Sequence, residues 1–188
     1  IYIEKFDSWN ITHINFIDSH ATPLVEHQKL YQSNPPGSIE FKLGLETEIN
    51  MANNAREDLL VVLDEFELIR PPEKFSQFHT SMRTSLSMFN NILNNVVLLN
   101  SMELSGASQN DLNNAWFEYQ DQVLAYETQW AEASRLYFEL FGKDLLSGLD
   151  NNDLDPPSPV QVPTPTPLAK SGEGLTGSLS LNEDKEVE

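Results

Sequence analysis

Apolar residues recur every three or four positions through the middle of the chain, and this spacing predicts long helices. An α-helix turns once in about 3.6 residues, so side chains at such steps line one face that can be buried. In residues 39–70 this stripe holds one charged residue, Arg56, and otherwise consists of Leu45, Ile49, Ala52, Leu59, Leu63 and Phe66. We therefore expect a helix over 39–70.

Two further apolar stripes follow in the sequence. The second, in 72–104, is formed by His79, Met82, Leu86, Phe89, Leu93 and Val96. The third, in 108–141, is formed by Leu112, Trp116, Tyr119, Val123, Tyr126, Trp130, Ala133, Tyr137 and Leu140. This third stripe persists for about four heptads, which is typical of coiled-coil-like packing.

Proline and glycine mark the ends of these helices. Pro71 and Pro72 end the first helix, because proline disfavours helical geometry in the preceding residue and lacks a backbone donor. Residues 108–111 resemble a capping box, with aspartate at its last position. Gly106 and Gly142 are natural C-terminal stops. Both connections are short, so neighbouring helices are expected to run antiparallel.

The first 32 residues are harder to interpret, because their apolar spacing mixes strand-like and helix-like steps. We favour helix there because the rest of the chain is helical. Thr22 and Pro23 resemble a helix start, with threonine as the N-cap and proline at the first helical position. A break in the helix is therefore expected at Pro23. Residues 33–37 form a loop.

These elements predict an all-α protein, an antiparallel up-down bundle of three long helices (about 39–70, 72–104 and 108–141) with an N-terminal helical segment. The bundle domain covers residues 1–149. Six of the eleven prolines lie within 156–167. We expect 150–188 to be an acidic, disordered tail, because such a composition buries too little apolar surface to offset the conformational entropy lost on folding.

The net charge of −18 bears on possible partners. Residues 150–188 hold 8 acidic and 2 basic residues, so a net −12 remains on the bundle domain. Nucleic acid and anionic membrane surfaces are unlikely partners for a chain with so few basic residues. There is no cysteine, which excludes disulfides and thiolate metal sites in this sequence. No apolar run approaches the roughly 20 residues of a membrane span.

Histidines are the most suggestive candidates for chemistry. His79 follows the Pro71-Pro72 corner. It is either a ligand or proton-transfer group, or a residue that forms a hydrogen bond across the corner and locks it; we favour the structural role. His13, His20 and His27 are seven residues apart, about 10 Å along a helix, too far for two of them to share one metal ion. We expect them on a solvated or interfacial face.

Other known chemistries lack their signatures. A di-iron bundle needs Glu-x-x-His on two helices, which this sequence does not contain. Residues 150–155 alternate oxygen ligands but lack the glycine and terminal glutamate of an EF-hand loop. We therefore expect no enzymatic activity, no cofactor and no bound metal.

The corner resembles a known group of proteins. A helix that ends in Leu-Ile-Arg-Pro-Pro-Glu at 68–73, with His79 opening the next helix, is similar to helical-bundle domains of bacterial exported proteins and lipoproteins. The resemblance covers residues 60–99. It implies an extracytoplasmic location and a binding or scaffold role, without an activity. The absence of a lipid-bearing cysteine departs from the lipoprotein pattern.

Two functional hypotheses remain. The first is a non-enzymatic interaction or scaffold module of the bacterial cell envelope, which binds a protein or another envelope component. The second is a small-molecule or sensor bundle, with a pocket lined by Trp116, Tyr119, Tyr126, Trp130 and Tyr137. A ligand binder needs a pocket of roughly 300 Å³ between helices. A partner-binding bundle needs an exposed apolar patch, for which the tryptophan-containing helix is the first candidate.

Overall fold

The structure is a computed structural model, and it describes residues 1–145. Within these residues 86% are helical and none belongs to a strand, so the all-α prediction is confirmed. The predicted tail, 150–188, and its calcium-like 150–155 segment lie outside the described residues.

The N-terminal segment is a helical rod as long as the others. It consists of α1 (Tyr2–Phe16), a five-residue π-helix (Ile17–Ala21) and α2 (Thr22–Tyr31). As predicted, α2 begins at Thr22 with Pro23 in its first turn. The predicted break and N-cap are wrong, because Thr22 has helical geometry and its side chain makes no capping hydrogen bond. Its N–H donates instead to the Ile17 carbonyl, one residue further back than in an α-helix. This widened turn keeps the chain helical up to Pro23, which has no N–H to donate.

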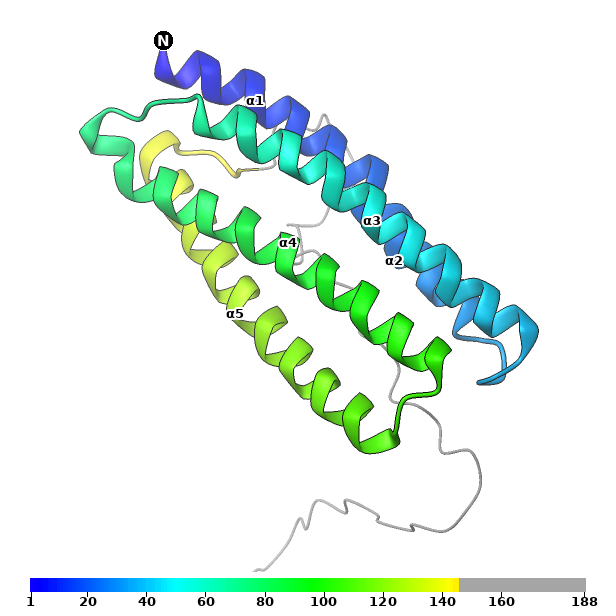
Figure 1. Ribbon diagram of the computed structural model, residues 1–188. Coiled ribbons are helices and arrows are strands. Elements are labelled where there is room, and N and C mark those ends of the chain that lie inside the picture. Colours follow the sequence, from blue (N-terminus) through cyan, green and yellow to red (C-terminus); the bar gives the residue numbers. More distant parts are fainter. Residues whose placement is uncertain (146–188) are drawn as a thin grey trace, which may run out of the picture.

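Three single helices follow this rod. They are α3 (Ile39–Glu67), α4 (Ser76–Ser105) and α5 (Gln109–Phe141). Figure 1 shows that each long rod reverses the direction of the one before it. The structure thus has four long rods, where the sequence predicted three long helices and an N-terminal helical segment.

The first rod closes the bundle by packing on both α3 and α5. The Trp9 indole donates to the Val62 carbonyl of α3 at 2.8 Å. The ring of Phe6 lies 5.5 Å from that of Tyr137 on α5, centroid to centroid. Asn10 donates to the carbonyl of Leu145, just beyond α5, at 2.9 Å. Side chains from all four rods therefore share one core.

The corner between α3 and α4 is longer than predicted. Helix α3 ends at Glu67 and not at residue 70, and the backbone of Pro72 is extended. A short 3₁₀ turn, Glu73–Phe75, then leads into α4. This unwound stretch turns Ile69 and Phe75 into the core, where both are buried. Burial of two apolar side chains thus favours the corner over a continued helix.

The other helix ends follow the predicted signals. Ser108 Oγ accepts from the Asp111 N–H at 3.2 Å and donates to the Asp111 carboxylate at 2.6 Å. In a standard capping box that carboxylate would accept from the backbone of Ser108, so this is a variant of the box. Gly106 and Gly142 end α4 and α5 with left-handed backbone, at φ values of 72° and 66°.

No helix among residues 1–145 combines the length and the apolar content needed to cross a bilayer.

Candidate functional site

His79 lies at the corner, where it packs on aromatic neighbours. Its ring stacks on Phe66 of α3 at a centroid distance of 4.2 Å and an interplanar angle of 12°. Its Nδ1 lies 3.5 Å from the hydroxyl of Tyr2 on α1. Burial lowers the pKa of His79; Arg83 adds to this effect and Glu67 opposes it. The residue therefore joins three rods as a mainly uncharged ring, as a structural role at the corner requires.

The aromatic stripe of α5 mostly faces the core. Tyr119, Tyr126, Trp130 and Tyr137 are buried, while Trp116 is partly buried and stacks on Tyr119. At the end of the stripe, Leu136 is buried and Leu140 is exposed, the reverse of the predicted pattern. These rings are used chiefly for packing.

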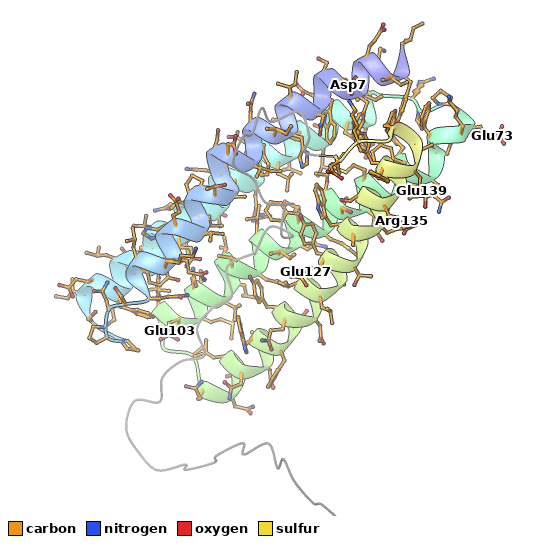
Figure 2. All side chains as sticks on the ribbon, turned by 180° about the vertical axis from the view of Figure 1, so that it is seen from behind. Asp7, Glu73, Glu103, Glu127, Arg135 and Glu139 are labelled. Atoms are coloured by element: carbon orange, nitrogen blue, oxygen red, sulfur yellow. The ribbon has the colours of Figure 1, made fainter. Side chains whose placement is uncertain are left out.

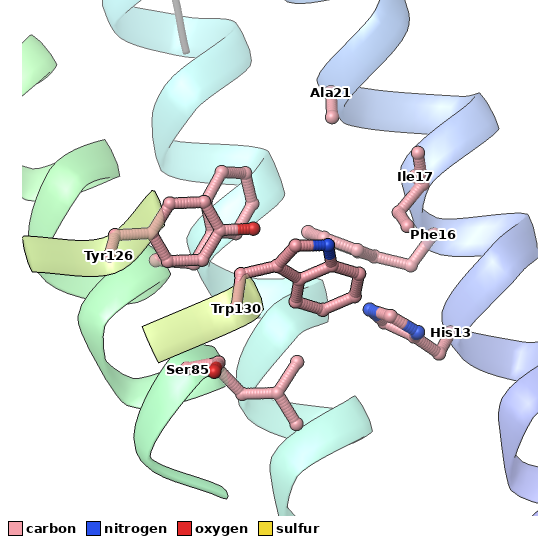
Figure 3. Close-up of a pocket in the computed structure, with 9 residues that line it drawn as sticks. His13, Phe16, Ile17, Ala21, Ser85, Tyr126 and Trp130 are labelled. Carbon is pink, nitrogen blue, oxygen red and sulfur yellow. The ribbon is translucent and has the colours of Figure 1, made fainter. Parts of the chain in front are cut away.

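A small pocket lies beside the π-helix, between the first rod, α4 and α5 (Figure 3). Trp130 lies between Tyr126 and His13, with Phe16, Ile17 and Ala21 opposite. Its free volume is about 10 Å³. A space of that size holds at most a single water molecule.

His13 is the most buried titratable group in that pocket. Its side chain is 3% exposed and stacks on Trp9 at a centroid distance of 5.1 Å. Its Nδ1 has no hydrogen-bond partner among the described residues. Burial lowers the pKa of His13 to about 4, so the ring is neutral near pH 7.

The three evenly spaced histidines all face neighbouring helices. His20 Nε2 pairs with the Asp58 carboxylate at 2.7 Å, and His27 Nε2 lies 3.0 Å from the Gly44 carbonyl. His13 is thus buried, whereas His20 and His27 lie at helix interfaces and stay partly exposed, within the solvated or interfacial face that the spacing predicted. Within residues 1–145, no three histidine or acidic side chains come together in a way that could hold a metal ion.

Glu48 forms a buried polar cluster that the sequence analysis missed. The residue is 1% exposed in the interior of α3. The hydroxyl of Tyr31 on α2 donates to Glu48 Oε2, and the amide of Asn100 on α4 donates to the same oxygen at 2.9 Å. The other oxygen, Oε1, is buried and has no partner among the described residues.

Electrostatics at this cluster favour a protonated Glu48. Burial raises its pKa, while the hydrogen bonds from Tyr31 and Asn100 and the nearby His27 lower it. Burial also raises the pKa of Tyr119 on α5, and the Glu48 carboxyl adds to that shift. A buried carboxyl group thus connects α2, α3 and α4 at this end of the bundle, close to α5.

A second stripe runs along the outer face of α5, and the sequence analysis missed it too. Phe117, Leu124 and Phe138 are 62%, 64% and 56% exposed. Together with Ala131, which is also exposed, they are spaced seven residues apart. Residues at this spacing drift by only about 20° per heptad, so they form one line along the helix. We call these four residues the outer stripe.

Acidic side chains flank the outer stripe. At about 100° per residue, Glu118, Asp121, Glu132 and Glu139 lie on one side of it and Glu127 on the other. Arg135 is the one basic residue of α5. It pairs with Glu132 at 2.8 Å and with Glu139, and Figure 2 shows it along α5 with Glu139 and Glu127.

Fold and surface together define a helical bundle with a packed aromatic interior and an amphipathic outer face on α5. Comparison of the chain with protein-family models, curated proteins and solved structures gives no match.

Proposed function

We propose that this protein is a non-enzymatic interaction module that binds a partner protein through the outer stripe of α5. The observation that carries the proposal is the alignment of Phe117, Leu124 and Phe138 on one exposed line. Scattered apolar side chains are normal on a protein surface, whereas an aligned series on one helix is typical of a helix-docking face.

Burial of the outer stripe against a partner would contribute favourable free energy to binding. Full burial of a Leu or Phe side chain contributes about 1.5–3 kcal/mol. Three such side chains together could therefore contribute several kcal/mol before the entropy of association is subtracted.

The inter-helix pocket supports the sensor hypothesis less well. The free volume beside Tyr126 and Trp130 is about 10 Å³, far below the roughly 300 Å³ that a small-molecule site needs. Tyr126 and Trp130 fill the space that a ligand would occupy. A larger hollow of about 510 Å³ lies between α4 and α5, but it is open to solvent and no residue of the predicted aromatic stripe lines it. The interaction module is therefore the function that we propose.

The location of the module is also part of the proposal. The resemblance of residues 60–99 to bacterial exported bundles supports a place in the cell envelope. A partner there would be another envelope protein or envelope component.

Site-specific photo-cross-linking in the source cells tests the binding face. A photoreactive residue at position 124 should give a discrete cross-linked species that contains a second protein. The matched control is position 43 on α3, because Leu43 is 55% exposed and lies on a different helix.

Equal cross-linking from positions 43 and 124 would contradict the proposed face. A cross-link from position 124 to residues 150–188 of the same chain would contradict it as well, because the tail would then cover the stripe.

A further inference from the structure

The charges around the outer stripe narrow the choice of partner. Of the flanking acidic residues, Glu132 and Glu139 are paired with Arg135. Within residues 1–145, Glu118, Asp121 and Glu127 form no ion pair. An apolar stripe with unpaired carboxylates beside it favours a partner that brings positive charge to the rim.

Three acidic occupants are disfavoured for this reason. A second copy of the chain would place one acidic helix against another, and both copies carry a net charge of −18. The segment 150–188 has a net charge of −6 and would be repelled by the same flank. An anionic lipid surface would be repelled in the same way.

The length and period of the outer stripe indicate the shape of the partner. From Phe117 to Phe138 the helix rises about 31 Å, at 1.5 Å per residue. The seven-residue period lets a partner helix contact the stripe at one position per heptad, half of the two that a coiled-coil seam uses, because Gln120, Glu127 and Ser134 are polar. A partner helix of about three to four heptads could therefore follow the whole stripe.

We propose that the partner segment is a basic amphipathic helix, whose apolar seam packs along the outer stripe while its Lys or Arg residues face the acidic flanks. This inference rests on the proposed function, because it names the partner of the same face. Bidentate pairing makes arginine well suited to the carboxylates of Asp121 and Glu127.

Synthetic helices test the chemistry directly with the full-length protein. The probe is a labelled peptide of about four heptads with leucine at the a and d positions and lysine at e and g. One control peptide carries glutamate at e and g. Another has the basic composition with its apolar positions scrambled. Fluorescence anisotropy should show that only the basic amphipathic peptide binds, and that affinity falls about ten-fold or more between low and high salt.

Two charge-matched variants separate docking from general attraction to an acidic protein. Leu124→Glu and Leu43→Glu each add one negative charge at an exposed site. Diffuse attraction would make both variants bind the basic peptide slightly better. Docking on the stripe should instead weaken binding to Leu124→Glu about ten-fold or more and leave Leu43→Glu near wild type.

Several results would overturn the inference. Equal binding of the acidic and basic peptides would remove the role of charge, and equal binding to both variants would remove the role of the stripe. Self-association that Leu124→Glu abolishes, seen by analytical ultracentrifugation, would make a second copy the occupant. If no basic helix binds while position 124 still cross-links a second protein, the partner chemistry is wrong and the proposed function stands.

Discussion

The carboxyl group of Glu48 lies where the core would otherwise hold an apolar side chain. Both of its donors, Tyr31 and Asn100, converge on one oxygen, and burial raises the pKa of the group. This arrangement suits a neutral carboxylic acid, because an ionised one would leave its second buried oxygen unsolvated.

We therefore expect Glu48→Gln to keep the stability of the wild type at pH 7 or to increase it. Glutamine retains an acceptor for Tyr31 and Asn100 without a group that can ionise. Glu48→Ala should lose about 2–4 kcal/mol, since it leaves both donors unpaired and opens a cavity. Urea unfolding of the two variants measures the difference. A loss above about 1 kcal/mol in Glu48→Gln would contradict this expectation.

The sequence analysis did not identify Glu48 as buried, because Glu48 and Ile49 are neighbours and only one of them can lie at the centre of the buried face of α3. Periodicity placed Ile49 on the stripe of α3, whereas the structure buries Glu48 fully and Ile49 only partly. Tyr31 reaches Glu48 from a rod whose path the sequence did not define. Hydrophobic spacing does not reveal which distant polar side chains, here Tyr31 and Asn100, will pair with a buried residue.

At the scale of the elements, the corner between α3 and α4 depends on stacking as well as on proline. His79 contacts Phe66 face to face, and both lie against the start of α1 through Tyr2 and Phe6. The prolines end the helix, but the ring contacts decide how the chain re-enters the bundle.

His79→Ala should therefore reduce stability by about 1–2 kcal/mol, because a half-buried aromatic contact is lost. His79→Phe should retain most of that stability, since it keeps a ring against Phe66. Thermal or chemical unfolding of both variants tests the structural role. If the alanine variant matches the wild type, the ring does not hold the corner.

Element boundaries that depend on local signals were predictable, whereas those set by packing were not. Gly106, Ser108 and Gly142 end or begin helices where expected. Helix α3 ends at Glu67 and not at the predicted residue 70, because the burial of Ile69 and Phe75 competes with continuation of the helix.

At the scale of the whole molecule, the N-terminal rod converts three helices into a four-rod bundle. Its buried residues Tyr2, Phe6, Trp9, His13 and Phe16 follow regular helical steps. The sequence analysis expected a helical segment here but could not define its buried face, because His13 lies on that face while Ile3 and Ile11 lie exposed outside it. The outer stripe of α5 was not predicted for a related reason, since hydrophobic periodicity identifies one buried face per helix and Phe117, Leu124 and Phe138 lie outside it.

His13 makes the stability of this bundle dependent on pH. Its pKa falls from 6.5 to about 4 on folding, so the unfolded chain binds a proton that the folded chain rejects. The stabilisation is present above pH 6.5 and is lost as the pH falls toward 4. A shift of this size corresponds to about 3 kcal/mol. Glu48 acts in the opposite direction, because its raised pKa favours the fold at low pH and loses that effect as the pH rises through the folded value.

The difference between wild type and His13→Phe isolates this effect. Phenylalanine keeps a ring against Trp9 and Trp130 and cannot take up a proton. Between pH 6.5 and 4 the wild type should lose about 3 kcal/mol more stability than the variant, measured by urea unfolding at each pH. Glu48→Gln is the matched control, because it leaves His13 intact and should retain the acid-side loss. Parallel curves for wild type and His13→Phe would show that His13 takes up its proton equally well in the folded chain.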